Sequence, residues 1–339
     1  MLPEAGQQPD AEYDAWEHML GDAFDEEDGG LVALVASIYD EVKVYMDAAY
    51  NHPQGRTAGD PQIHTVAAYI ADKDDWRKLR KEWQAALNKF DVPYFHMKEF
   101  EHALNVATYG RGQISSKSPY QGWSAAKLND LKDRLHDIIN RKRPDGLARI
   151  TSVTSNMLVS DYEDSLPDDL KNHPECRSAF ILNVTNAMKG IANWANNSVY
   201  YKPIHYIFAG GDNETGNLDA WFSRCFERDE VMRFYRLGKG FSRIGYDIQW
   251  MKGEPALQMV DCPAYEMNRA NVEWAKNDFN PILKSEMRAS LSSLCRIDHF
   301  GVTMRKAELM EVYRDVRLDD ERLGYNATKK ASGRKTARL

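Results

Sequence analysis

The sequence lacks an apolar run long enough to cross a membrane, because no stretch of its 339 residues approaches the roughly 18 uninterrupted apolar residues that a spanning helix needs. Its beginning is acidic and lacks the basic-then-apolar pattern of a signal peptide. The four cysteines lie far apart without CxxC spacing, which argues against a disulfide scaffold and against a zinc knuckle. We therefore expect a cytoplasmic protein with no membrane partner.

Several common catalytic motifs are also missing. The sequence has no GxSxG elbow, no GxxxxGK[ST] phosphate loop and no HExxH motif. The glycine pair Gly238 and Gly240 lacks the third glycine of a dinucleotide fingerprint, so we expect no nucleotide cofactor. What remains is a set of acidic residues placed where predicted strands end.

Charge is distributed unevenly along the chain. Residues 1–30 hold ten of the 51 acidic residues and no Lys or Arg, so 41 acidic residues remain against 44 basic ones. The last 14 residues carry five basic side chains and no acidic one. We expect a flexible acidic arm at residues 1–30 and a disordered basic tail at residues 324–339. The near-neutral body between them permits a polyanionic ligand without requiring one.

Apolar runs and turn formers divide the body into alternating strands and helices. Strands are predicted at residues 42–47, 63–71, 147–159, 204–209 and 244–250. Helices are predicted between an N-cap at Asp72 and a stop at Pro93, and at residues 124–141, 174–196, 217–228 and 255–276. The remainder, to about residue 317, is predicted to be helical and accessory. This alternation predicts one α/β domain at residues 31–323, with a mixed sheet, helical insertions and a C-terminal helical extension.

Asp47 ends the first predicted strand. Side chains alternate along a strand, so the even-numbered residues of 42–47 point to one face and the odd-numbered ones, including Asp47, point to the other. A carboxylate at the end of a buried strand is costly unless something positive meets it. A metal ion, a capping interaction and a neighbouring Arg are the three partners to consider.

Two other acidic positions follow the same pattern. Asp212 comes just after the strand at 204–209 and a Gly-Gly turn, with Glu214 two residues on. Asp261 lies early in a helix, three residues after Gln258 and on the same helix face. Carboxylates from two strand ends and one helix can converge at a sheet edge, where they would form the hard-oxygen cage that Mg²⁺ or Mn²⁺ requires. Taken one at a time, these residues also suit a turn, a helix cap or an ion pair.

Three segments resemble a known family when taken together. They are Val-Tyr-Met-Asp at residues 44–47, Phe-Ala-Gly-Gly-Asp at 208–212, and Pro-Ala-Leu-Gln-Met-Val-Asp-Cys-Pro-Ala-Tyr-Glu at 255–266. They are similar to domain-of-unknown-function family 3800, which is grouped with ribonuclease H-like folds, and the resemblance covers residues 41–277. It implies a central mixed sheet with acids on its first strand, on a later strand and on the last helix. The implied ligands of two Mg or Mn ions are Asp47, Asp212 and Asp261.

The chain departs from the family pattern at three points, one of which is Val260 where the closing motif usually has Ala. The family's opening motif is Asp-Glu-Ser-Gly, whereas Asp47 is followed by Ala-Ala-Tyr, so the opening Glu is missing. Pro263 lies inside the closing motif and suits a first helical turn, which would place the start of that helix later. The segment at residues 95–100 resembles a His-containing segment of the family, which implies Glu99 as a further ligand and His96 as a proton shuttle or phosphate contact. Glu214, close to Asp212, is the other candidate for that ligand. Alternatively, His96 and Glu99 form a side-chain pair on a short helix.

A basic and aromatic stretch at residues 233–243 bears on the substrate. Its basic residues are Arg233, Arg236, Lys239 and Arg243, interleaved with three aromatic ones. Basic side chains contact phosphates and aromatic rings stack on unpaired bases, so the stretch is a candidate nucleic-acid contact. A solvated loop with core-facing aromatic side chains explains it nearly as well.

The sequence therefore suggests a metal-dependent nuclease or phosphoryl-transfer enzyme on a ribonuclease H-like core, with DNA or RNA as its partner. The main rival is a non-catalytic module of the same fold that binds nucleic acid or protein. A structural protein whose acidic arm covers a basic partner is a third reading.

Overall fold

The chain folds around one mixed sheet, and a computed structural model describes residues 42–50, 60–197, 204–210, 218, 221–222, 246–277 and 298–322. All of these belong to one compact unit, Glu41–Leu339. The predicted arm at 1–30 and tail at 324–339 lie outside the described residues. The described elements run in the order β1 (Val42–Tyr50), β2 (Ile63–Asp72), α3 (Lys73–Phe90), α4 (Met97–Tyr109), α5 (Ala125–Ile139), β3 (Thr151–Leu158), α6 (Val159–Ser165), α7 (Ala179–Asn197), β4 (Ile204–Gly210), β5 (Tyr246–Trp250), η2 (Met251–Gly253), α10 (Pro255–Lys276), β6 (Asp298–Met304) and α12 (Lys306–Arg322).

The sheet has the strand order β5-β4-β1-β2-β3-β6. Strands β1, β2 and β3 form an antiparallel meander, while β4 lies parallel to β1, β5 parallel to β4, and β6 parallel to β3. Parallel neighbours need crossover connections, and α7 lies between β3 and β4 in the chain as α10 lies between β5 and β6. The expectation of an α/β fold with a mixed sheet is confirmed. No helix of the described part of the chain is both long and apolar enough to cross a membrane.

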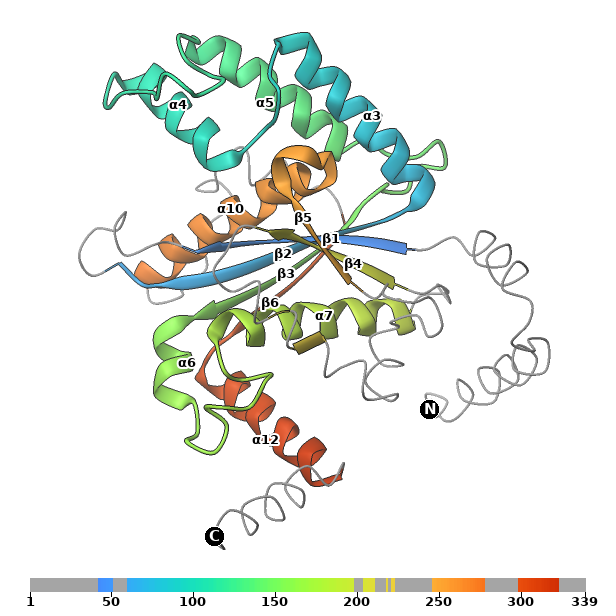
Figure 1. Ribbon diagram of the computed structural model, residues 1–339, viewed down its shortest axis with the longest axis vertical. Coiled ribbons are helices and arrows are strands. Elements are labelled where there is room, and N and C mark those ends of the chain that lie inside the picture. The colour runs from blue at the N-terminus through green and yellow to red at the C-terminus, as the bar shows by residue number, and fades with distance from the viewer. Residues whose placement is uncertain are drawn as a thin grey trace, which may run out of the picture. The chain divides into compact units, whose positions relative to one another are not determined.

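Helices cover the two faces of the sheet differently (Figure 1). Helices α3, α4, α5 and α10 lie over one face, and α7 lies under the other. The predicted alternation along β1 is confirmed, because Val44 and Met46 pack on the α7 side whereas Tyr45 packs on the α10 side. Asp47 has the parity of Tyr45, so it lies on the α10 face, which is where the candidate site forms.

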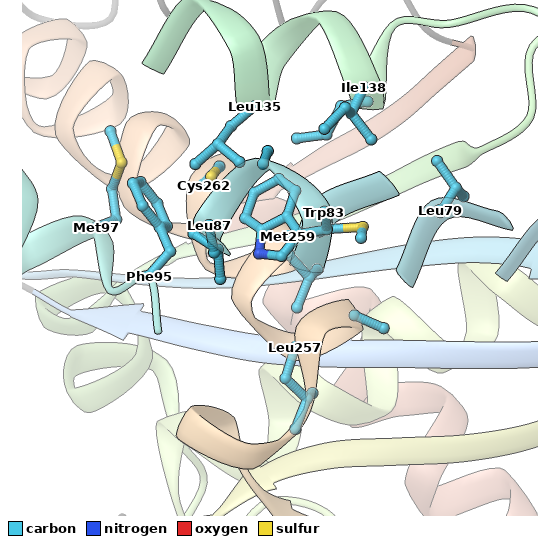
Figure 2. Close-up of a cluster of buried hydrophobic side chains, with 14 of the residues drawn as sticks. Leu79, Trp83, Leu87, Phe95, Met97, Leu135, Ile138, Leu257, Met259 and Cys262 are labelled. Carbon is cyan, nitrogen blue, oxygen red and sulfur yellow. The ribbon is translucent and has the colours of Figure 1, made fainter. Parts of the chain in front are cut away.

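The core on the α10 face is built from the helical stripe that the sequence indicates. Trp76, Leu79, Trp83 and Leu87 recur at steps of three and four along α3 and are all buried. Figure 2 shows Trp83 lying among side chains of α5, α10 and the segment that leads into α4. This packing fixes α10 against both the sheet and α3, so residues of α10 have defined positions relative to β1.

A smaller apolar cluster lies where β3 and β6 meet α6 and α12. Met157 and Met304 contribute from the strands, and Leu309 and Tyr313 from α12. Here the sequence prediction was wrong, since it placed accessory helix where β6 pairs with β3. The segment Phe300–Thr303 contains an aromatic residue, a glycine and two β-branched residues, which suit a strand better than a helix.

Other boundaries also differ from prediction. Strand β1 continues to Tyr50 and does not end at Asp47, because residues 47–50 stay paired with β2. The predicted strand at 147–159 ends at Leu158, and the short helix α6 follows at once. Helix α7 begins at Ala179 and not at residue 174.

Two cap and helix-start predictions have mixed outcomes. Asp72 occupies the N-cap position of α3, but its side chain makes no cap bond and accepts instead from Arg143 Nη2 at 2.9 Å. Helix α10 starts at Pro255, as the periodicity predicted, and runs through Pro263. Proline there removes one backbone hydrogen bond. The surrounding turns are buried, so tertiary packing holds the helix together across that position.

Candidate functional site

Asp47 lies where β1 parts from β4. The ladder between these strands ends at the pair Met46 and Phe208, whereas Asp47 still pairs with Ala67 of β2. Its side chain projects from the α10 face at the carboxyl end of the β1–β4 pair. This edge of a parallel pair is a common place for ligand sites, because both chains turn away from the sheet there.

Asp261 meets Asp47 from the second turn of α10. A side-chain hydrogen bond joins the two carboxyl groups, which requires a proton on one of them. The backbone N–H of Met97 donates to Asp261 Oδ2 at 2.6 Å. Burial raises the pKa of Asp261, against the opposing influence of His96, of the Met97 N–H and of Asp47. The site is therefore a pair of hydrogen-bonded carboxyl groups, of which Asp261 is buried and Asp47 is half-buried.

His96 and Glu99 stand at the start of α4, beside this pair. His96 is the N-cap residue of α4, and its Nδ1 lies 3.5 Å from Glu99 Oε1. This contact agrees with the alternative prediction, in which His96 and Glu99 form a side-chain pair. Both also act electrostatically on Asp261. The structure therefore brings together four predicted site residues, Asp47, His96, Glu99 and Asp261, from three separate elements.

The other site residues that the sequence predicts belong to segments that the structure does not describe. Asp212 and Glu214, and the basic residues Arg233, Arg236, Lys239 and Arg243, lie outside the described residues. The strand that leads to Asp212 is described as far as Gly210. A Cβ on Gly210 would meet Ile248 Cγ2 at 3.0 Å, so the glycine allows β4 to approach β5 closely at the same edge of the sheet.

A rim of charged and aromatic groups beside the pair was missed from the sequence. Tyr94 donates its hydroxyl to Glu99 Oε2 at 2.9 Å, and Lys252 Nζ lies 3.2 Å from the Tyr94 hydroxyl and 4.2 Å from its ring centroid. Lys252 Nζ is also 3.9 Å from Glu99 Oε1. Hydrogen bonding to Tyr94 raises the pKa of Lys252, so this lysine stays cationic. No local pattern signals the rim, because its two segments lie over 150 positions apart in the chain.

Gln258 is a second residue whose role the sequence did not reveal. Its Oε1 accepts from Trp83 Nε1 at 3.1 Å and from the Phe95 N–H at 2.9 Å. Its Nε2 donates to the carbonyls of Met251 and Lys252, both at 3.2 Å. The spacing to Asp261 placed the two on one helix face, but it did not indicate these partners.

Cysteine chemistry does not suit this site. Cys262 follows Asp261 and is fully buried. Burial raises the pKa of its thiol, and the nearby carboxylates of Asp261 and Glu266 raise it further. A thiol that stays protonated is a poor nucleophile, so the reactive groups here are carboxyl oxygens and an imidazole.

The described residues contain no group of three or more His, Cys, Asp or Glu side chains arranged to hold a metal ion. The donors that are present are carboxyl oxygens, which are the type that Mg²⁺ and Mn²⁺ prefer. Asp47 and Asp261 approach closely enough that a proton must separate their charges, and a divalent cation could take that place. The two residues fit part of a metal site, and at least one more ligand is needed to complete it.

Comparison with known proteins found no match: no family model matches the chain, and neither a curated protein nor a solved structure is significantly similar to it.

Proposed function

We propose that this protein is a metal-dependent phosphoryl-transfer enzyme, specifically a nuclease acting on DNA or RNA. The observation that carries the proposal is the contact between Asp47 and Asp261, which are far apart in the sequence and meet at a sheet edge. Two carboxyl groups in contact, one of them buried, are unfavourable unless a proton or a cation lies between them.

The ribonuclease H-like reading is part of this proposal. The family resemblance implies a mixed sheet with acids on its first strand and on its last helix. The sheet is mixed, and Asp47 lies on β1 while Asp261 lies on α10, the helix that carries the closing motif. This agreement in order and placement supports the resemblance, and the later-strand acid would be Asp212.

Asp47 and Asp261 would hold the metal, with Asp212 and either Glu214 or Glu99 completing the ligand set. Two bound Mg or Mn ions would supply activation of a water molecule and stabilisation of the leaving oxygen. The Met97 N–H fixes one oxygen of Asp261, which leaves the other free to turn toward Asp47. His96, which acts electrostatically on Asp261, would be the group that moves a proton at the edge of the pair.

Lys252 supplies the positive charge that a phosphodiester substrate would meet first. Its side chain is 64% exposed, so it reaches solvent while Tyr94 and Glu99 hold its amine near the carboxyl pair. The amine is a point charge that suits a phosphate oxygen. The stretch at 233–243 is proposed as a second contact for the same strand.

A cleavage screen tests the function directly. The chain is incubated with single- and double-stranded DNA and RNA in the presence of Mg²⁺ or Mn²⁺, alongside Asp47→Asn and Asp261→Asn. We expect metal-dependent cleavage by the wild type and none by either variant. Asp133→Asn, a change at an exposed position of α5, is the control and should cleave normally.

A non-catalytic nucleic-acid- or protein-binding module is the second candidate. It is favoured by the sequence after Asp47, where Ala48 and Ala49 pack against the two opposite cores and supply no carboxylate. On this reading the chain binds nucleic acid, with or without metal, and cleaves nothing. Binding without cleavage under every metal condition would decide for the module.

A further inference from the structure

The side-chain amide of Gln258 is saturated. A primary amide has two N–H donors and a carbonyl oxygen with two lone pairs. Its oxygen takes the donors of Trp83 and Phe95, and its nitrogen supplies the carbonyls of Met251 and Lys252. Gln258 is 2% exposed, so water does not substitute for these partners.

Three of the four partners belong to two segments beside α10, and the fourth, Trp83, lies on α3. Phe95 lies between Tyr94 and His96 in the segment leading into α4, and the first turn of α4 carries the Met97 N–H and Glu99. The other segment is η2, which carries Lys252. The oxygen of Gln258 bonds the first segment and its nitrogen bonds the second. One residue on the helix that bears Asp261 therefore holds both halves of the rim.

We propose that Gln258 is a positioning residue that sets the placement of His96 and Lys252 around the Asp261 carboxyl group. The direct links between the two rim segments, from Lys252 to Tyr94 and to Glu99, are at the surface, where water competes for the same hydrogen bonds. The buried amide provides the link that water does not loosen. The catalytic consequence rests on the proposed function, whereas the structural consequence does not.

Two substitutions test the accepted and the donated hydrogen bonds of the Gln258 amide separately. Gln258→Glu keeps the shape and the two accepted bonds, but a carboxylate donates nothing to η2. Gln258→Met keeps the length and loses all four bonds. Gln84→Glu is the matched control, because Gln84 lies on the exposed side of the same α3 helix as Trp83 and bonds only Asn88, at 2.9 Å.

Backbone hydrogen exchange reads the two segments separately. The Phe95 amide reports on the segment before α4, and the Glu254 amide, which donates to Met251 O at 3.1 Å, reports on η2. In Gln258→Glu we expect the Glu254 amide to exchange about tenfold faster, the order expected from losing one hydrogen bond, with Phe95 unchanged. In Gln258→Met both amides should speed up. Gln84→Glu should leave both at wild-type rates.

Steady-state kinetics adds a readout that mere loss of stability does not move. At a temperature where every variant is folded, Gln258→Glu should raise KM several-fold with a smaller change in kcat, because it frees Lys252 alone. Gln258→Met should also lower kcat, because it frees the segment that carries His96. Equal melting temperatures with this KM-against-kcat split would support positioning.

The outcomes are distinguishable. If the wild type neither cleaves nor responds to metal, the proposed function fails, and the exchange measurement still decides the role of Gln258. Wild-type exchange rates at Phe95 and Glu254 in a folded Gln258→Glu and Gln258→Met would overturn the inference. So would rapid exchange of the Phe95 amide in the wild type, a result that needs no variant to fold.

Discussion

Asp261 illustrates at the scale of one residue how a structural and a functional role can be told apart. Asparagine in its place can still accept from the Met97 N–H and can donate to Asp47, so the local shape survives. We predict that Asp261→Asn leaves the metal-free protein as stable as the wild type or slightly more stable, because its amide N–H can supply the hydrogen bond to Asp47 without a shared proton and the buried carboxyl group is removed. It should also abolish stabilisation by Mn²⁺. Thermal melts of both proteins with and without Mn²⁺ measure this.

An ordinary helix-cap or ion-pair aspartate would behave in the opposite way. Its replacement would destabilise the metal-free protein by about 1 kcal/mol, and metal would make no difference to either protein. A wild-type melt that does not respond to Mn²⁺ would count against the metal site itself.

His136 supplies a pH prediction that is independent of the candidate site. Burial in α5 lowers its pKa from 6.5 to about 4, with the positive charge of Lys132 as a smaller cause. The folded state therefore holds this imidazole neutral, and the unfolded state binds a proton more readily. Its contribution to stability is complete above pH 6.5 and is lost as the pH falls toward 4, by about 3 kcal/mol.

The measurement is urea unfolding of wild type and His136→Gln between pH 7 and pH 4. We expect the difference between their unfolding free energies to change across this interval, with the wild type losing more stability toward acid. Parallel pH profiles would mean that His136 is not held neutral by the fold.

At the scale of elements, what the sequence predicted depended on whether the determining contacts were local. The bounds of α10 and the stripe of α3 follow from periodicity within each helix, and the structure agrees with both. Strand β6 depends on pairing with β3, which no local pattern at residues 298–304 announces. Likewise the placement of Asp261 beside Gln258 is a local matter, whereas the contacts of Gln258 with α3 and η2 exist only in the folded chain.

Helices α7 and α10 pack on opposite faces of the sheet. Each contributes an asparagine whose side chain hydrogen-bonds to backbone groups of the sheet. Asn183 of α7 accepts from Ser155 Oγ at 2.6 Å and donates to the carbonyls of His64 and Ser155, both at 3.1 Å. From the other face, Asn268 of α10 donates to the carbonyls of Ala49 at 3.1 Å and Ile63 at 2.8 Å. These bonds fix each helix in register with the strands beneath it.

We predict that Asn183→Leu lowers the unfolding free energy by about 3 kcal/mol, because it leaves several buried polar groups without their partner. Chemical denaturation of the two proteins measures the difference. Asn129→Leu, at an exposed position of α5, is the control and should change stability by less than about 0.5 kcal/mol. Equal losses in the two variants would show that the bonds of Asn183 do not anchor α7.

At the scale of the whole molecule, the described residues already supply an apolar core on each face of the sheet. The segments 1–28 and 326–339 each carry charge of one sign. We predict that removing both leaves the melting temperature within a few degrees of that of the full chain, because little apolar surface is lost. Differential scanning calorimetry of the trimmed and full chains tests this. A larger fall would mean that one of the removed segments is docked on the body.

The α/β class could be predicted for the whole chain because it depends only on the alternation of element types. The convergence of Asp47 and Asp261 could be anticipated for a similar reason, since strand ends and helix starts tend to gather at one edge of a sheet. The rim of Tyr94 and Lys252 could not, because it depends on how η2 packs beside the entrance to α4.

The strand order has a consequence for synthesis of the chain on the ribosome. The meander of β1, β2 and β3 is complete once residue 158 has emerged, but β1 waits for β4 at residues 204–210 and β3 waits for β6 at residues 298–304. Until then β1 and β3 are edge strands of the growing sheet. Their unpaired backbone N–H and C=O groups can pair with strands of other chains. Translation that stalls between these points would release products prone to aggregate, so rapid completion of the polypeptide matters more here than for a sheet built from neighbouring hairpins.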